Sequence, residues 1–248
     1  MTSPARTGEP DIARVAGLFA NGTRARILMA LAGGRSLPAG ALAEHAGVTA
    51  QAASAQLNRL TAAGLITVRQ AGRHRYYELA DRRIAELMEG LAALAPAQPV
   101  ARTLRAGNRA EALRRARVCF DHAAGRFGVA VTEALLDSGA LVPAGGPQDG
   151  PADAEHPYRL GPAAVPVLTG LGVPESHLAD DRRRPLLRFC VDWTEQRHHL
   201  AGRLGADLLD AFTTAGWITL AANTRALRLT PAGEEALASR LFDGRQPR

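Results

Sequence analysis

The chain has 248 residues, and its 30 basic and 24 acidic side chains give a formal net charge of +6 at neutral pH. Its 46% hydrophobic and 22% charged residues are typical of a globular protein, and its length allows one large domain or two ordinary ones. No apolar run approaches the roughly 18–20 residues of a membrane helix, and the first ten residues lack the apolar stretch of a secretory signal. Two cysteines are too few for a disulfide scaffold. We therefore expect a cytoplasmic protein without a membrane partner.

The basic charge is concentrated at the front of the chain, and all 30 basic residues are arginines. Residues 1–95 hold 11 Arg and 7 acidic residues, residues 96–117 hold 6 Arg and 1 acidic residue, and residues 118–248 hold 13 Arg and 16 acidic residues. The formal charges of the three segments are therefore +4, +5 and −3. This asymmetry is typical of a nucleic-acid-binding front half joined to a rear half with a different role.

Residues 1–95 show the patterns of several short helices and one hairpin. Apolar periodicity predicts helices over residues 11–19, 23–32, 39–46 and 50–63, and Gly47 separates the last two. Residues 65–68 and 74–79 are predicted to form a hairpin, and Asp81 begins a helix that ends near Leu94. This is the element order of a winged helix-turn-helix DNA-binding domain, and the fold class is mainly α with small β-hairpin wings (α+β). In such a domain the second helix of the pair enters the major groove.

The predicted recognition helix and the hairpin tip carry side chains suited to DNA. Gln makes bidentate contacts with adenine, small apolar side chains contact the thymine methyl, and Arg at a wing suits phosphate or the minor groove. The predicted DNA-contacting residues are Thr49, Gln51, Ala52, Ser54, Gln56, Asn58 and Arg59 on the helix and Arg69, Arg73, His74 and Arg75 on the wing. The alternative function is a winged-helix protein-interaction module, or a redox- or metal-sensing module without specific operator binding.

Two stretches, NGTRARILMAL and LAEHAGVTAQAASAQLNRLTAAGLITVRQAGRHRYYEL, resemble the ArsR-type family of winged-helix repressors over residues 11–94. The resemblance implies a homodimer formed largely by the first and last helices and a two-fold operator, an inverted repeat in double-stranded DNA. It also implies release by a metal or a small effector. Many metal-sensing members carry Cys-x-Cys on the helix before the recognition helix, or Asp/His pairs on the last helix. Residues 41–45 hold no Cys and the last helix holds no His, so both usual sensing sites are absent.

The rear half contains an internal repeat. Residues 96–117 predict an Arg-rich connecting helix with a solvated basic face, and residues 118–248 predict a sensing or assembly domain made of two repeats, 118–172 and 186–242. His122 and Gly139 recur as His199 and Gly216 at a constant offset of 77 residues. Each repeat is expected to form a winged-helix-like unit of helix, hairpin and helix. Longer ArsR-type members with a Cys-x-Asp-Trp-Thr-Glu segment resemble this half, and the resemblance does not indicate a ligand.

Both cysteines lie in Cys-x-Asp, and each is followed by a His before Ala-Gly-Arg. In one interpretation the cysteines are small buried residues, each Asp caps a helix and each His bonds across the repeat. In a second, a soft or borderline divalent metal such as zinc is bound. In a third, the cysteines form a thiol switch, with Arg188, Arg197, His198 and His199 lowering the pKa of Cys190. The residues of these sites are Cys119, Asp121, His122, Cys190, Asp192 and His199.

The aromatic residues of the rear half allow an apolar pocket for an organic effector, although such residues are more often core. The candidate pocket residues are Phe120, Phe127, Trp193, Phe212 and Trp217. No organic-cofactor motif, Gly-rich phosphate loop, GxSxG or HExxH sequence is present, so we do not expect an enzyme. The sequence thus predicts a DNA-binding transcriptional regulator, a homodimeric repressor released by an effector that the C-terminal domain senses.

Overall fold

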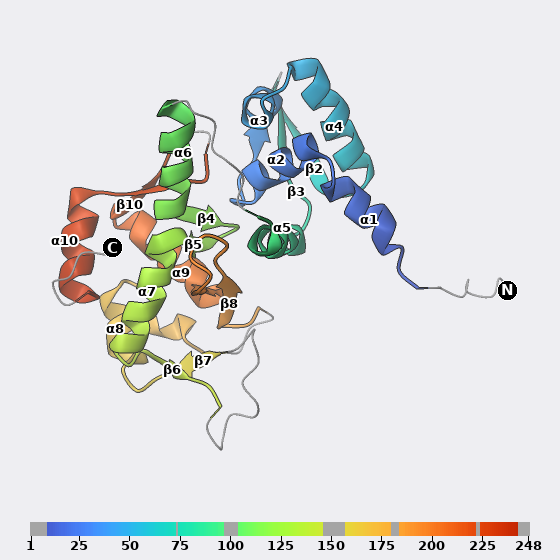
Figure 1. Cartoon of the computed structure of the whole chain (residues 1–248). Coiled ribbons are helices and arrows are strands. Elements are labelled where there is room, and N and C mark those ends of the chain that lie inside the picture. Colours follow the sequence, from blue (N-terminus) through green and yellow to red (C-terminus); the bar gives the residue numbers. More distant parts are fainter. Residues whose placement is uncertain are drawn as a thin grey trace. The chain divides into compact units, whose positions relative to one another are not determined.

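The computed structural model describes residues 9–72, 74–96, 104–145, 157–179, 184–221 and 224–242 (Figure 1). Helices joined by short antiparallel strand pairs make up this described part of the chain, which confirms the expected mainly α fold class with small hairpins. Every helix in these ranges is too short or too polar to cross a lipid bilayer.

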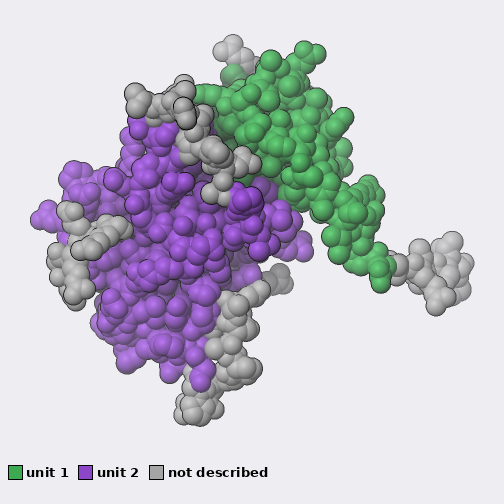
Figure 2. Space-filling model, viewed as in Figure 1, with its two compact units in different colours: residues 1–31, 36–80 green, residues 32–35, 81–248 purple. Residues whose placement is uncertain are grey.

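The contacts divide the chain into two compact units, coloured separately in Figure 2. Unit 1 consists of Met1–Leu31 and Ser36–Ala80, and unit 2 consists of Ala32–Arg35 and Asp81–Arg248. This division differs from the expected domain boundary at residue 95. The helix that follows Asp81 belongs to unit 2 because it packs on a strand of that unit and ion-pairs within it.

Unit 1 has the helix order and hairpin expected of a winged helix. Its elements are α1 (Ile12–Phe19), α2 (Gly22–Leu31), β1 (Leu37–Pro38), α3 (Ala39–Ala46), α4 (Ala50–Ala62), β2 (Ile66–Ala71) and β3 (His74–Leu79). The helices enclose a core of Ile27, Leu28, Leu31, Leu42, Leu57 and Leu60. Strand β1 was not expected, since two residues are too few to show a strand pattern; it pairs with the middle of β3 in a three-stranded sheet of order β1-β3-β2.

Unit 2 begins with two helices, α5 (Arg82–Leu94) and α6 (Leu104–Arg115), and continues with two segments of the same element order. The first segment consists of β4 (Arg117–Cys119), β5 (His122–Ala124), α7 (Gly125–Asp137), β6 (Leu141–Pro143), β7 (Tyr158–Leu160) and α8 (Ala164–Gly170). After the 3-10 turn η1 (Glu175–His177), the second consists of β8 (Arg188–Val191), β9 (His198–Ala201), α9 (Gly202–Thr214), β10 (Ile218–Leu220), β11 (Leu227–Leu229) and α10 (Pro231–Arg240). Each repeat therefore opens with a hairpin that the expected helix, hairpin and helix order left out, because strands of three or four residues give little periodicity.

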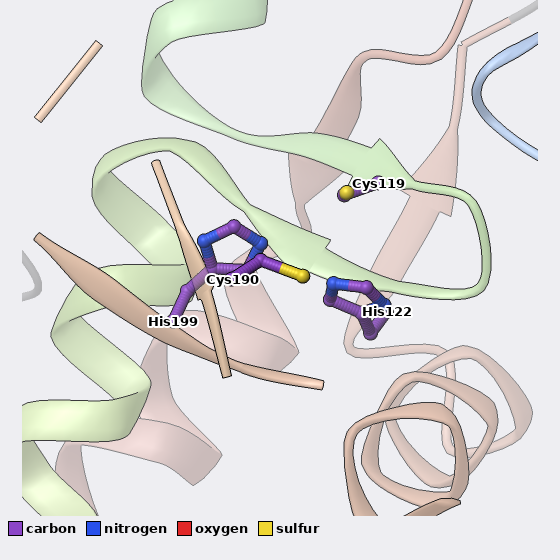
Figure 3. A group of neighbouring side chains, drawn as sticks. All are labelled: Cys119, His122, Cys190 and His199. Atoms are coloured by element: carbon purple, nitrogen blue, oxygen red, sulfur yellow. The ribbon is translucent and has the colours of Figure 1, made fainter. Parts of the chain in front are cut away.

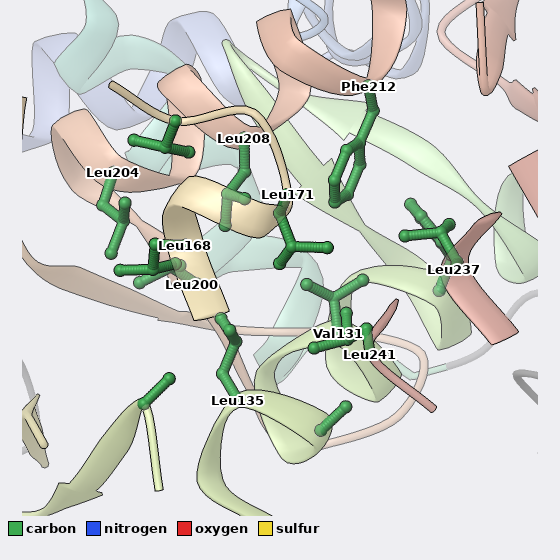
Figure 4. Packing of buried hydrophobic residues seen from close by; sticks show 14 of the residues in the cluster. Val131, Leu135, Leu168, Leu171, Leu200, Leu204, Leu208, Phe212, Leu237 and Leu241 are labelled. Carbon is green, nitrogen blue, oxygen red and sulfur yellow. The ribbon is translucent and has the colours of Figure 1, made fainter. Parts of the chain in front are cut away.

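In each of the two segments, the first helix packs on the first hairpin of the other segment. Helix α7 of the first lies on β9 of the second, and α9 of the second lies on β5 of the first. Two glycines lie where the repeats meet, because a methyl group at Gly205 would lie 3.1 Å from Cβ of His122 and one at Gly128 would lie 3.6 Å from Cβ of His199. Side chains of both segments then fill a single hydrophobic core, including Val131, Leu135, Leu168, Leu204, Leu208, Phe212 and Leu237 (Figure 4).

Candidate functional site

Helix α4 of unit 1 presents a continuous polar face to solvent. Ala53, Leu57 and Leu60 point into the core, and Thr49 caps the helix by accepting a 3.2 Å hydrogen bond from the Ala52 backbone N–H. Six of the seven residues predicted on this helix to contact DNA are exposed: Thr49, Gln51, Ala52, Ser54, Asn58 and Arg59. The face is therefore available to a partner along the length of the helix.

The seventh residue, Gln56, is only partly exposed because it takes part in a hydrogen-bond network. Its Oε1 accepts a 3.0 Å hydrogen bond from Nη1 of the buried Arg24. The same guanidinium donates to the Leu18 and Gly17 carbonyl oxygens at the end of α1, each at 2.8 Å. Gln56 thus ties α4 to α1 and α2, a role that its position on the polar face did not indicate.

The β2–β3 hairpin forms the expected wing. Its register runs from Ile66 opposite Leu79 to Ala71 opposite His74. Arg69, His74 and Arg75 are exposed, and the Arg69 guanidinium lies 5.8 Å from the centre of the Tyr76 ring. Arg73, also predicted to contact DNA, lies outside the described residues.

In unit 2 the structure brings together four side chains that the sequence linked only by pattern. Cys119 faces His122 across the β4–β5 hairpin, and Cys190 faces His199 across the β8–β9 hairpin. The ligand atoms of these four residues lie within 4.8 Å of one another. Figure 3 shows the four side chains turned toward a common centre. Each hairpin therefore contributes one Cys–His pair at equivalent positions.

This Cys2His2 cluster is buried. Cys119, His122 and His199 are almost inaccessible to solvent, and Cys190 is partly exposed. The two imidazole rings stack with their centroids 5.1 Å apart. Among the described atoms, Nε2 of His122 and both ring nitrogens of His199 have no hydrogen-bond partner. Such buried polar atoms are costly unless another group satisfies them.

The two aspartates of the Cys-x-Asp pairs lie beside the histidines rather than within the cluster. Asp121 lies 3.2 Å from Nδ1 of His122, and an Asp192 carboxylate oxygen lies 3.8 Å from Nδ1 of His199. One interpretation of the sequence expected each aspartate to cap a helix. Asp192 accepts a 2.6 Å hydrogen bond from the Gly125 N–H at the start of α7, so the helix that it caps is in the other repeat.

The cluster favours loss of the proton from one thiol, Cys190, whereas the hydrogen bond with Cys190 and burial raise the pKa of the Cys119 thiol. The hydrogen bond with Cys119 lowers the pKa of Cys190 to about 5, and His122 acts in the same direction against the effect of burial. Burial lowers the pKa of His122, but its contacts with Asp121 and Cys190 raise it to about 9. The lowered Cys190 pKa agrees with the thiol-switch expectation, but its cause is different. Arg197 pairs with Glu133 and Arg188 pairs with Glu86, so these guanidinium groups are engaged elsewhere.

A buried charge network adjoins the cluster. Arg117, which is 0% exposed, lies 2.9 Å from Asp192 and 3.4 Å from Glu89 of α5. Arg225 lies 2.5 Å from the other oxygen of Glu89. The expectation that residues up to 117 carry a solvated basic face is therefore wrong for Arg117. Sequence reasoning also missed Glu89 and Arg225, because an isolated charge in a helix or loop is usually solvated and their partners are distant along the chain.

The five candidate effector-pocket residues do not share one cavity. Phe127, Phe212 and Trp217 pack in the hydrophobic core, and the Trp193 ring lies 4.6 Å from the Arg117 guanidinium. Phe120 lines a cavity of about 300 Å³ in unit 2. Cys119, His122 and Cys190 also line this cavity, which therefore reaches the Cys2His2 cluster.

A segment of four residues between α2 and β1 is held by unit 2. The Phe120 N–H, at the tip of the β4–β5 hairpin, donates a 2.6 Å hydrogen bond to the Ala32 carbonyl. Gly34 has a φ of 68°, and a methyl group there would overlap the Phe120 carbonyl. Phe120 also has a left-handed φ of 58°. The β4–β5 hairpin, which carries Cys119 and His122, therefore contacts the segment that joins α2 to β1.

Comparison with known proteins places the chain in a family. A helix-turn-helix domain family matches residues 19–69. The uncharacterized HTH-type transcriptional regulator YdfF of Bacillus subtilis (strain 168) is 36% identical over 232 residues, covering 94% of this chain and 97% of YdfF. The chain belongs to the HTH-type transcriptional regulators. The expectation of a helix-turn-helix transcriptional regulator is thereby confirmed, and this regulator is a DNA-binding protein of transcription control.

Other relatives match a smaller part of this regulator. The HTH-type transcriptional regulator CmtR of Mycobacterium bovis is 38% identical over 95 residues, 37% of this chain and 80% of CmtR. A solved structure, the homodimeric winged helix-turn-helix DNA-binding domain of Mb0332 from Mycobacterium bovis, is 31% identical and covers 36% of this chain and 88% of its own, with a TM-score of 0.31. YdfF thus extends over the rear half of this regulator, whereas CmtR and the Mb0332 domain match about a third of it.

Proposed function

We propose that this regulator is a homodimeric repressor that binds a two-fold operator through α4 and the β2–β3 wing and is released by an effector sensed in unit 2. The observation that carries the proposal is the exposed polar face of α4, followed by an exposed basic wing, in a chain of this family. Exposed Gln, Ser and Asn side chains match the edges of base pairs, and the wing arginines match phosphate.

Exposed apolar side chains on α1 and α5 support the homodimer. Ile12 of α1 is 74% exposed and Leu94 of α5 is 86% exposed. The remaining members of this set are Val15 on α1 and Leu87 and Leu91 on α5. Residues 87, 91 and 94 share one face of α5, because helix positions four and three apart lie above one another. These are the first and last helices of the winged-helix region, through which the family resemblance implies dimer formation.

The contacts that the rest of unit 2 makes with residues 32–35 support effector sensing in that unit. This segment joins α2 to β1, and its hydrogen bonds to Phe120 and Ala221 are made in unit 2. A ligand that changes the β4–β5 hairpin thus has a covalent route to the winged helix. By thermodynamic linkage, an effector that weakens operator binding must itself bind less tightly when the operator is bound.

Fluorescence anisotropy tests the operator arm of the proposal. A labelled DNA fragment from upstream of the regulator's own gene is titrated with full-length protein across a salt series, alongside a shuffled fragment of equal length. We expect preference for one inverted repeat, two chains per repeat and a steep fall of affinity with salt. Equal binding to both fragments, or weak binding without salt dependence, would contradict operator recognition and favour the interaction-module alternative.

A further inference from the structure

We propose that Cys119, His122, Cys190 and His199 form a tetrahedral site for a borderline or soft divalent metal ion, of which zinc is the representative. The site joins the two repeats of unit 2, away from the positions that the family resemblance associates with metal sensing. It goes beyond the proposed function because it is a property of unit 2 that does not depend on DNA binding.

The geometry of the two hairpins suits four-coordination. Each hairpin places one thiol and one imidazole opposite each other, and the four ligand atoms lie within 4.8 Å. Zinc–sulfur and zinc–nitrogen bonds of about 2.0–2.3 Å place tetrahedral ligand atoms roughly 3.3–3.8 Å apart. The cluster therefore has to contract by only about 1 Å around an ion.

The carboxylates beside the two histidines indicate which ring nitrogens face the metal. Asp121 lies against Nδ1 of His122, so Nε2 of that ring is left with no partner among the described atoms. An Asp192 oxygen lies 3.8 Å from Nδ1 of His199, and both nitrogens of this ring have no hydrogen-bond partner among the described atoms, so Nε2 is free to face the metal. A metal-bound histidine characteristically turns its other nitrogen toward a carboxylate, which orients the ring and raises its basicity. Each repeat thus supplies a Cys ligand, a His ligand and the aspartate that orients the His.

The ligand set determines the class of metal. Two sulfurs and two imidazole nitrogens favour zinc and its soft or borderline neighbours, whereas magnesium and calcium require oxygen ligands. Two thiolates balance the charge of a divalent ion. The adjacent Asp121 and Asp192 carboxylates are already paired with Arg184 and Arg117, so they add little uncompensated charge.

A metal explains the buried nitrogens better than a disulfide does. A bond between Cys119 and Cys190 would use both sulfurs and leave the unsatisfied nitrogens of His122 and His199 without a partner. The cavity of about 300 Å³ that reaches Cys119, His122 and Cys190 also supplies an entry path for an ion.

Metal titration of the full-length protein tests the site in the absence of DNA. A negative result would therefore contradict the metal site and would say nothing about operator binding. The reduced protein is stripped with a chelator and titrated with Zn²⁺ or Co²⁺. We expect one metal ion per chain by native mass spectrometry and, for Co²⁺, the strong visible absorption of a tetrahedral thiolate site. Protein that stays folded and metal-free in excess Zn²⁺, or that gives a weak octahedral Co²⁺ spectrum, would overturn the proposal.

Variants assign the metal to these residues. Cys119→Ser combined with Cys190→Ser is expected to abolish stoichiometric binding. His177→Gln is the matched control, because His177 lies beside Asp207 outside the cluster, and it should retain one metal ion. A folded double variant that keeps its metal overturns the assignment. Should the double variant fail to fold, alkylation of the unaltered protein decides: Zn²⁺ must slow modification of both thiols more than ~10-fold, and unchanged rates contradict the site.

Asp121 is a positioning residue in this site, and it has its own test. Asp121→Asn should weaken zinc binding ~10–100-fold while the stoichiometry stays at one, because the imidazole loses its carboxylate partner. Asp137→Asn, at an exposed position at the end of α7, is the control and should leave the affinity unchanged. Equal affinities for the two variants would show that Asp121 does not orient the ligand.

Discussion

Gln51 is the α4 side chain whose substitution tests sequence-specific operator binding most directly. It is exposed on the second helical residue of α4, whereas Gln56 is held by Arg24 and its loss also removes an internal hydrogen bond. Substitution of Gln51 is therefore expected to change DNA recognition without changing folding, whereas substitution of Gln56 is expected to change both.

We predict that Gln51→Ala weakens operator binding by about 1–3 kcal/mol, the usual contribution of a bidentate contact with a base. Binding to shuffled DNA should stay the same, because phosphate contacts are untouched. Anisotropy titrations with both DNA fragments measure the two affinities. An unchanged ratio of operator to shuffled affinity would show that Gln51 does not read a base.

At the scale of elements, α5 is anchored to unit 2 by one buried carboxylate. Glu89 lies between Arg117 and Arg225, and the attraction of these guanidinium groups outweighs burial and lowers the pKa of Glu89. Burial of a charge is tolerated only when its partners remain in place. The position of α5 therefore depends on the ion pairs of Glu89 with Arg117 and Arg225.

We predict that Glu89→Gln lowers the free energy of unfolding by about 3–5 kcal/mol, because two buried arginines lose their charged partner. Glu86→Gln on the same helix is the control. Glu86 pairs at the surface with Arg82 and Arg188, each at 3.2 Å, and its loss should cost less than about 1 kcal/mol. Denaturant midpoints followed by circular dichroism compare the variants. Similar midpoints for both would contradict the importance of the buried network.

Helix α7 depends in a different way on the hairpin beneath it. We predict that Gly128→Ala destabilises the protein by about 1–3 kcal/mol, because the added methyl group overlaps the Ala123 carbonyl and forces α7 away from its hairpin. Gly107→Ala in α6 should be neutral or stabilising by up to about 1 kcal/mol, since nothing lies within 4 Å of the added carbon. Thermal unfolding of the two variants tests the contrast, and equal transition temperatures would refute it.

For the whole molecule, the apolar face of α5 determines the expected oligomeric state. We predict that Leu87→Glu combined with Leu91→Glu converts a dimer into a monomer, because charges on both sides of a two-fold contact repel each other and lose solvation. Light scattering after size-exclusion chromatography measures the mass. Val165→Glu, an exposed apolar position on α8, is the control and should remain dimeric. A dimeric double variant would place the interface elsewhere.

Sequence patterns were informative where structure is local. The winged helix follows from helical periodicity, Gly47 and the Thr49 and Asp81 caps, and the helices and the hairpin formed within one or two residues of expectation, apart from a longer first wing strand. The internal repeat was visible because His and Gly recur at fixed spacing. The hairpins β4–β5 and β8–β9 were missed because their strands are too short to show alternation.

The sequence by itself determined the family, the polar face of α4 and the identities of the two Cys–His pairs. Only the tertiary structure decided that these pairs meet in one buried cluster, that Asp121 and Asp192 lie beside its histidines, and that Glu89 lies between two arginines. Helical periodicity and helix caps depend on residues only a few positions apart, so they can be recognised in the amino-acid sequence alone. The contacts between Cys119 and Cys190 and between Glu89 and Arg225 join residues far apart in the sequence. They depend on how the elements of unit 2 pack together, and no short stretch of sequence indicates that packing.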